Sequence, residues 1–286
     1  MVTVGDYFAL GFGSQIVQVG QNGSVPVRLI SSAGLSNLSF SVELPAGRLT
    51  NLTVLAVAGE VDSVDIQSSA TTRPSIIVNS RAGQSLQGDR ELATFNFGTV
   101  SNQSSAFVTL IPTNVVAQKP SAALVTNVVS LSGRLVLIGR EPLLESSLST
   151  LGTPSLTLYG NPGSTHQLQI APALGVANAW SNWMRVPMTN LMQILPGLNL
   201  PTNGIIFYRS FDLRADPPLL ELRPSTSAGG AVTVFGLPGV LYRLESGQTV
   251  TGPWSTVRTF TPSNSFYYVD GLSVTNPAIF YRARKP

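Results

Sequence analysis

The chain has 286 residues, of which 43% are hydrophobic and only 11% are charged. This length allows two or three domains, and the low charge, against about 25% in a typical soluble domain, implies a surface of uncharged polar side chains. The net charge is +3 and the basic residues are scattered, so no nucleic-acid groove is predicted. Without cysteine, disulfides and thiolate metal sites are excluded. No segment reaches the roughly 18 apolar residues of a membrane-spanning helix.

Short runs of Val, Ile, Leu, Phe and Thr alternate with clusters of Gly, Asn, Ser and Pro along the chain. Their spacing of about 8–12 residues predicts an all-β protein built from sandwiches. Many runs alternate apolar and polar positions, as in Val25-Pro-Val-Arg-Leu29, so each strand would cover a core with one face. In the first 140 residues we predict strands at Ser14–Val19, Ser24–Ile30, Leu38–Glu43, Leu49–Ala56, Val64–Gln67, Ser75–Asn79, Glu91–Phe97, Ala106–Pro112 and Leu131–Ile138, with a turn at Asp89–Glu91.

Three carboxylates, Glu60, Asp62 and Asp65, fall within six residues. In an extended segment Glu60 and Asp62 would project to the same side, where they could ligate calcium or act as an acid and base. The flanking residues lack the Asp-x-Asp-x-Asp-Gly pattern of a calcium loop. We therefore keep calcium as a candidate ligand and favour a solvated loop or a charged edge strand.

Four segments of the first 140 residues carry a family pattern. They are Val19-Gly-Gln-Asn-Gly-Ser-Val-Pro-Val27, Leu35-Ser-Asn-Leu-Ser-Phe-Ser-Val42, Glu91-Leu-Ala-Thr-Phe-Asn-Phe97 and Asn127-Val-Val-Ser-Leu-Ser-Gly-Arg-Leu-Val136. Together these segments resemble cohesin domains. They follow one another in the order of that family and cover most of residues 14–138. The resemblance implies a nine-stranded jelly-roll sandwich for residues 1–140.

The rest of the chain contains an internal repeat. Pro142-Leu-Leu-Glu145 recurs as Pro218-Leu-Leu-Glu221, and 11 of the 28 positions between 142–169 and 218–245 are identical. The two copies agree again at Phe207-Tyr-Arg209 and Phe280-Tyr-Arg282. The domain organisation predicted is therefore 1–140, 141–215 and 216–286.

The second copy carries Gly236-Leu-Pro-Gly239, Tyr242-Arg-Leu-Glu245, Trp254 and Phe280-Tyr-Arg282. This pattern resembles short C-terminal modules of large secreted proteins from environmental bacteria such as the Verrucomicrobia. We expect each copy to form a small immunoglobulin-like or fibronectin-like sandwich of about seven short strands.

The residues give little support for catalysis. The single histidine, His166, aligns with Tyr242 of the second copy, and a position that accepts either ring is better explained by strand packing than by a catalytic base. Trp180 and Trp183 are the candidates for a carbohydrate platform, because flat rings stack on sugar faces. The competing interpretation makes one of them the counterpart of Trp254. Of Tyr267 and Tyr268, which alternate faces, one should be buried and the other exposed.

These patterns predict a non-enzymatic extracellular or cell-surface protein for attachment or assembly through protein contacts. Self-association into a surface layer or filament is one form of this hypothesis, and the expected partner is a protein or a second copy of the chain. The alternative is a carbohydrate-binding accessory region of a secreted polysaccharide-degrading enzyme. Location outside the cell is inferred from composition, since Met1–Asp6 shows no secretory signal.

Overall fold

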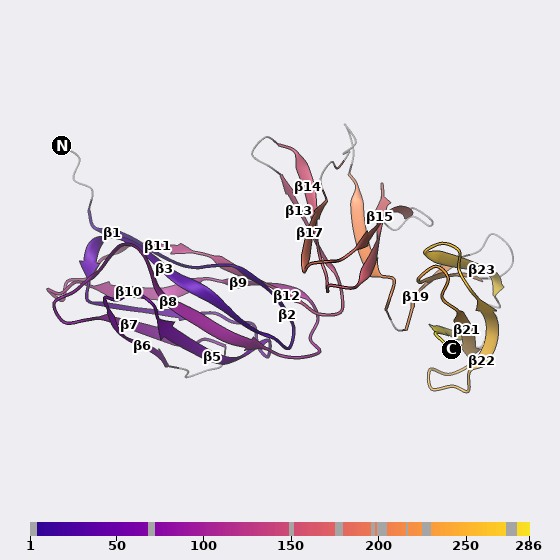
Figure 1. The fold of residues 1–286 in the computed structure, drawn as a ribbon, viewed down its shortest axis with the longest axis horizontal. Coiled ribbons are helices and arrows are strands. Elements are labelled where there is room, and N and C mark those ends of the chain that lie inside the picture. Colours follow the sequence, from indigo (N-terminus) through magenta and orange to yellow (C-terminus); the bar gives the residue numbers. More distant parts are fainter. Residues whose placement is uncertain are drawn as a thin grey trace. The chain divides into compact units, whose positions relative to one another are not determined.

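The computed structural model describes residues 5–67, 72–148, 152–174, 180–195, 198, 205–215, 217–224, 230–272 and 279–286. These residues form strands and no helix, which confirms the expected all-β class (Figure 1). Since the described segments hold no helix, none of them offers a long apolar helix able to cross a membrane. The chain divides into two units, Met1–Arg140 and Glu141–Pro286. Asp216, at one of the expected boundaries, lies outside the described residues.

The first unit contains twelve strands in three sheets among its described residues. The five-stranded sheet has the order β11-β1-β3-β8-β5, the four-stranded sheet has the order β10-β4-β7-β6, and a three-stranded sheet has the order β2-β12-β9. Their bounds are β1 Tyr7–Phe12, β2 Gln15–Gln18, β3 Asn22–Leu35, β4 Asn37–Val42, β5 Leu49–Ala56, β6 Val61–Gln67, β7 Ser75–Ser80, β8 Leu86–Thr99, β9 Ala106–Leu110, β10 Pro112–Gln118, β11 Asn127–Leu131 and β12 Gly133–Ile138.

The observed strands extend the prediction in two ways. Strand β5 has the predicted bounds, but β3 and β8 each run for 14 residues and pair from Asn22↔Gly98 to Leu35↔Leu86. The turn predicted at Asp89–Glu91 is wrong, because these residues lie inside β8, where Asp89 forms a salt bridge with Arg28 of the neighbouring strand β3. Cross-strand pairing therefore keeps these charged residues inside a strand, although local composition predicts that the strand is interrupted there.

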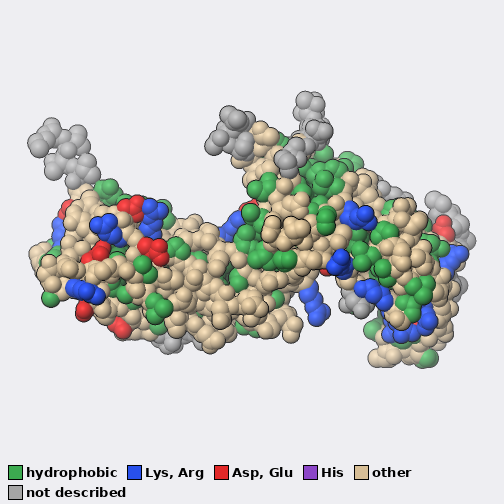
Figure 2. All heavy atoms as spheres, in the orientation of Figure 1, with side chains coloured by type: hydrophobic (Ala, Val, Ile, Leu, Met, Phe, Trp, Pro, Cys, Tyr) green, Lys and Arg blue, Asp and Glu red, His purple; other side chains and the backbone are tan. Residues whose placement is uncertain are grey.

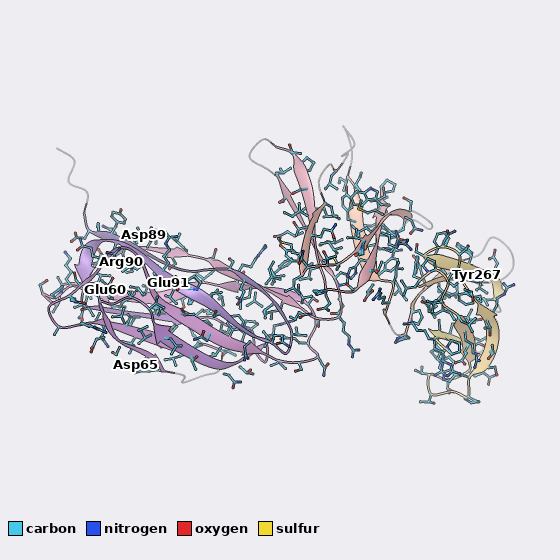
Figure 3. All side chains as sticks on the ribbon, in the orientation of Figure 1. Glu60, Asp65, Asp89, Arg90, Glu91 and Tyr267 are labelled. Carbon is cyan, nitrogen blue, oxygen red and sulfur yellow. The ribbon has the colours of Figure 1, made fainter. Side chains whose placement is uncertain are left out.

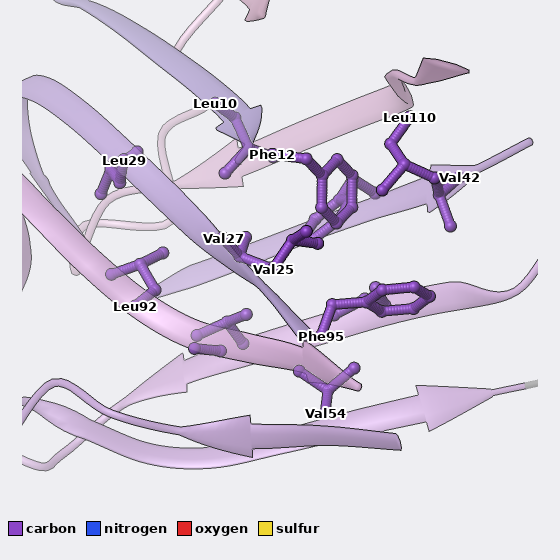
Figure 4. Close-up of a cluster of buried hydrophobic side chains, with 14 of the residues drawn as sticks. Leu10, Phe12, Val25, Val27, Leu29, Val42, Val54, Leu92, Phe95 and Leu110 are labelled. Carbon is purple, nitrogen blue, oxygen red and sulfur yellow. The ribbon is translucent and has the colours of Figure 1, made fainter. Parts of the chain in front are cut away.

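The core of the first unit lies between its sheets (Figure 4). Phe12 of β1 packs edge-on against Phe40 of β4 and Phe95 of β8, with ring centres 6.0 and 5.7 Å apart. The three rings come from both larger sheets, so aromatic packing joins the two layers.

The second unit contains the two copies of the repeat. Each copy has six strands among its described residues, arranged in two three-stranded sheets with the orders β13-β14-β17 and β16-β15-β18 in repeat 1, and β19-β20-β23 and β22-β21-β24 in repeat 2. Their bounds are β13 Leu143–Leu148, β14 Pro154–Tyr159, β15 Thr165–Ala171, β16 Ser181–Pro187, β17 Met192–Leu195, β18 Phe207–Asp212, β19 Leu219–Pro224, β20 Gly230–Phe235, β21 Tyr242–Gly247, β22 Ser255–Phe260, β23 Phe266–Leu272 and β24 Phe280–Arg284.

A glycine covered by a ring explains one identity between the repeats. A Cβ on Gly236 would lie 2.6 Å from the ring of Tyr242, and a Cβ on Gly160 would lie 2.5 Å from Nε2 of His166. Both rings are buried. The glycine is therefore retained because the ring of the following strand rests on its backbone.

Candidate functional site

The three acidic candidates of the first unit do not gather into a metal site. Glu60 precedes β6 and its carboxylate contacts Nε of Arg90 at 3.2 Å, while Asp62 and Asp65 are exposed on β6. Figure 3 shows Glu60 near Arg90 and Asp65 well away from both. Within the described part of the chain, no group of three or more acidic or histidine side chains could hold a metal ion. Calcium binding by these residues stays a prediction.

His166 makes a contact with a serine that resembles the Ser–His pair of a hydrolase triad. Its Nε2 shares a hydrogen bond of 2.8 Å with Oγ of Ser164, but the ring is 1% exposed. Burial lowers the pKa of His166, although the Asp212 carboxylate and the Phe211 carbonyl act in the opposite direction. The Ser164 hydroxyl donates to the carbonyl of Asn161. A substrate cannot reach this pair, so the geometry is that of a packed strand.

The arginine of each Phe-Tyr-Arg sequence lies over a tryptophan. The guanidinium carbon of Arg209 is 4.3 Å from the centre of the Trp180 ring, and Arg282 is 4.3 Å from the centre of the Trp254 ring. Nε of Arg209 also donates to Gln169 at 2.7 Å, and Nε of Arg282 donates to Glu245 at 2.8 Å. Trp180 is therefore the structural counterpart of Trp254.

Trp183 belongs to the interior of repeat 1. Its ring is partly buried against the core of that repeat and lies 5.5 Å, centre to centre, from the ring of Tyr208. The two tryptophans proposed as one carbohydrate platform thus have different environments. Tyr267 packs against Phe260 with ring centres 4.1 Å apart, and Tyr268 is exposed, which confirms that the two tyrosines point to opposite faces.

Among the described residues, the two repeats contact each other through one apolar cluster and several polar contacts, one of which runs from Nζ of Lys285 to the carbonyl of Arg214 at 3.3 Å. Phe211 of β18 packs edge-on against Phe235 of β20 with ring centres 4.5 Å apart, and Leu213 and Phe266 join the same cluster. Arg209 contacts both carboxylate oxygens of Glu221 at 3.2 and 3.3 Å. The hydroxyl of Ser265 donates to Gln167 at 2.7 Å.

Two adjoining hollows lie along this contact between the repeats. The smaller, about 230 Å³, is lined by Gln169, Trp180 and Asn182 of repeat 1 and by Thr233, Phe235 and Tyr268 of repeat 2. The larger, about 500 Å³, shares Asn182 and Phe266 with the smaller one. We call the two hollows together the inter-repeat groove. Its walls combine aromatic rings with amides and hydroxyls, the composition of a small-molecule site.

A second surface with the means to bind a partner is the edge strand β11. It pairs with β1 in parallel, and the described residues provide no other strand along it. Val129 is 51% exposed and Leu131 is 45% exposed. The sequence from Ser121 to Gly133 carries no charge. Backbone groups along such an edge are free to pair with another strand.

The remaining edges of the two larger sheets carry features that hinder such pairing. Strand β6 presents exposed Asp62 and Asp65. Strands β5 and β10 are interrupted by bulges at which Asn51 and Asn114 each have a φ of 51°. Charges and bulges are the usual protection of an edge strand, so β11 is the unprotected edge of these two sheets.

The rest of the surface in view is largely neutral. Figure 2 shows wide areas without charged side chains, with Lys and Arg gathered over parts of the second unit.

Among the residues at the sites above, the sequence pointed to Trp180 through its spacing from Trp183 and to neither Thr233 nor Asn182. The repeated Phe-Tyr-Arg sequence was a signal that could have identified Arg209 and Arg282 as residues with a shared structural role.

Comparisons with known proteins show likeness to solved structures only. No family model matches the chain, and no curated protein matches it. One similar structure is the seventh ScaB type I cohesin from Pseudobacteroides cellulosolvens, with 17% identity over 48% of this chain and 96% of that chain and a TM-score of 0.40. A non-cellulosomal cohesin from the archaeon Archaeoglobus fulgidus has 17% identity over 47% and 93%, with a TM-score of 0.39. The cohesin module of a Clostridium perfringens family 33 glycoside hydrolase has 14% identity over 47% and 98%, with a TM-score of 0.40.

Proposed function

We propose that this chain is a non-enzymatic attachment or assembly protein of the cell surface or extracellular space, and that copies of it associate by pairing at strand β11. The observation that supports the proposal is the unprotected edge of β11, with exposed Val129 and Leu131 and no charge between Ser121 and Gly133. Two such edges can pair antiparallel about a two-fold axis, so that each copy presents the same surface.

Strand addition suits the composition of this surface. Main-chain hydrogen bonds would supply the affinity, and the exposed Val129 and Leu131 would pack against their counterparts once the strands are paired. Leu131 already rests on Gly11 of β1, where a Cβ would lie 2.7 Å from the Cβ of Leu131. Gly11 and Leu131 are also cross-strand partners, so the end of β11 lies directly beside β1.

The test is the molar mass of the full chain, measured by size-exclusion chromatography with light scattering over rising concentration. We expect dimers or larger species for the native chain and monomer for Val129→Lys, since a lysine on an edge strand opposes pairing. Val116→Lys on the bulged edge β10 is the matched control, because Val116 is 46% exposed. A native chain that stays monomeric, or a Val116→Lys chain that dissociates equally, would contradict the proposal.

A further inference from the structure

The inter-repeat groove is a site separate from the β11 edge. Its smaller hollow is lined by both repeats, with Trp180 contributed by repeat 1 and Tyr268 by repeat 2. Tyr268 is 45% exposed, and its cross-strand neighbour on the same sheet is Thr233. The groove therefore presents an accessible ring beside hydroxyl and amide groups.

The polar groups of the groove are held in place by bonds that leave the walls neutral. Nε2 of Gln169 donates to Oδ1 of Asn182 at 2.7 Å, and Oε1 of Gln169 accepts from Arg209. The Arg209 guanidinium is itself paired with Glu221. No charged residue lines the smaller hollow, and Arg185 is the one charged side chain lining the larger. An ionic ligand has no strong partner in the smaller hollow.

A buried hydroxyl at the wall of the groove lacks a partner. Thr233 is 3% exposed, and its Oγ1 has no hydrogen bond with any residue in the described part of the chain. Buried hydroxyls are normally hydrogen-bonded, so an unpaired one beside a hollow is an observation that points to a ligand. A ligand hydroxyl seated against this wall would supply the missing partner.

We propose that the inter-repeat groove binds a neutral oligosaccharide. Sugars combine apolar ring faces with hydroxyl edges, which matches aromatic rings next to amides and hydroxyls. Tyr268 contacts a ring face, Asn182 binds a hydroxyl, and the adjoining larger hollow holds the next sugar unit. The ligand bridges both repeats, so the site exists only while repeat 1 and repeat 2 are in contact.

The test is native gel electrophoresis of the full chain through gels that contain hydroxyethylcellulose, xyloglucan, mixed-linkage β-glucan or galactomannan. We expect retardation by at least one of the four polymers. Tyr268→Ala and Asn182→Ala should each raise the Kd for that polymer roughly tenfold, a loss on the scale of one ring or amide contact. Both side chains lie at the groove wall, and unchanged tryptophan fluorescence verifies that each variant is folded.

Trp254→Ala provides the matched control. Trp254 makes the same contact with Arg282 that Trp180 makes with Arg209, but it does not line the groove. Retardation by none of the four polymers would overturn the proposal. So would a Tyr268→Ala chain that binds as tightly as the native one, or a Trp254→Ala chain that loses as much affinity.

Discussion

The guanidinium carbon of Arg282 lies 4.3 Å from the centre of the Trp254 ring, and its Nε donates to Glu245. Repeat 1 has the same arrangement, with Arg209 over Trp180 and bonded to Gln169. The residue after Phe-Tyr is thus an arginine in both repeats, because one planar guanidinium group can stack on an indole ring and donate a hydrogen bond to a side-chain oxygen at the same time. A lysine cannot reproduce both contacts.

Replacing Arg282 by lysine should destabilise the second unit by about 1 kcal/mol, because the stacking contact is lost while a positive charge is kept. The measurement is urea unfolding followed by tryptophan fluorescence. All three tryptophans, at positions 180, 183 and 254, lie in the second unit, so the signal reports that unit. Arg258→Lys is the control, because the guanidinium carbon of Arg258 lies farther from its ring, 6.0 Å from the centre of Tyr267, and the contact is correspondingly weaker. Equal effects of the two changes would refute the role assigned to the stack.

The stability of the second unit should fall between pH 7 and pH 5. Burial lowers the pKa of His166 below its ordinary value of 6.5, so as the pH falls the unfolded chain takes up a proton before the folded chain does. Protonation therefore favours unfolding in this window. The two arginines that bond to Glu245 outweigh its burial and lower its pKa from 4.5, so Glu245 acts below this window.

His166→Tyr isolates the histidine, because repeat 2 already carries a tyrosine at this position, where the Tyr242 hydroxyl accepts from the backbone nitrogen of Leu237. The variant should show a flatter dependence of unfolding free energy on pH between 7 and 5. A dependence as steep as that of the native chain would assign the effect to other groups.

Gly236→Ala should destabilise repeat 2 by about 2 kcal/mol, because the new methyl group would lie 2.6 Å from the buried Tyr242 ring. Thermal unfolding detected by tryptophan fluorescence measures the loss. Gly59→Ala, where a Cβ meets nothing within 4 Å, should leave the stability of its own unit nearly unchanged by calorimetry. A tolerated Gly236→Ala would mean that the ring of Tyr242 can move aside.

The contact between the repeats should depend more on its aromatic pair than on its ion pair. A double-mutant cycle on Phe211 and Phe235 should give a coupling of about 1 kcal/mol. The Arg209–Glu221 pair, whose side chains are both partly exposed, should give about 0.5 kcal/mol or less. Urea unfolding of the single and double alanine variants provides both values, and the reverse order would show that the docking is electrostatic.

The limits of the sequence are clear at the acidic residues. Glu60, Asp62 and Asp65 are close in the chain, and alternation suggested a shared side, but Glu60 belongs to the turn before β6 and pairs with Arg90 of β8. Its partner is 30 residues away. Local spacing predicts which side chains can meet, whereas the pairing of distant strands decides which ones do.

Apolar alternation and turn residues by themselves determined the all-β class and the burial of one tyrosine in the pair Tyr267 and Tyr268, because successive side chains of a strand point to opposite faces. The internal duplication was determined by comparing two segments of the sequence. Which tryptophan matches Trp254, which edge lacks protection and which residues of the two repeats form a groove were decided only by the tertiary structure. The contact between the two repeats places residues such as Trp180 and Tyr268 at one hollow, and no local pattern encodes that proximity.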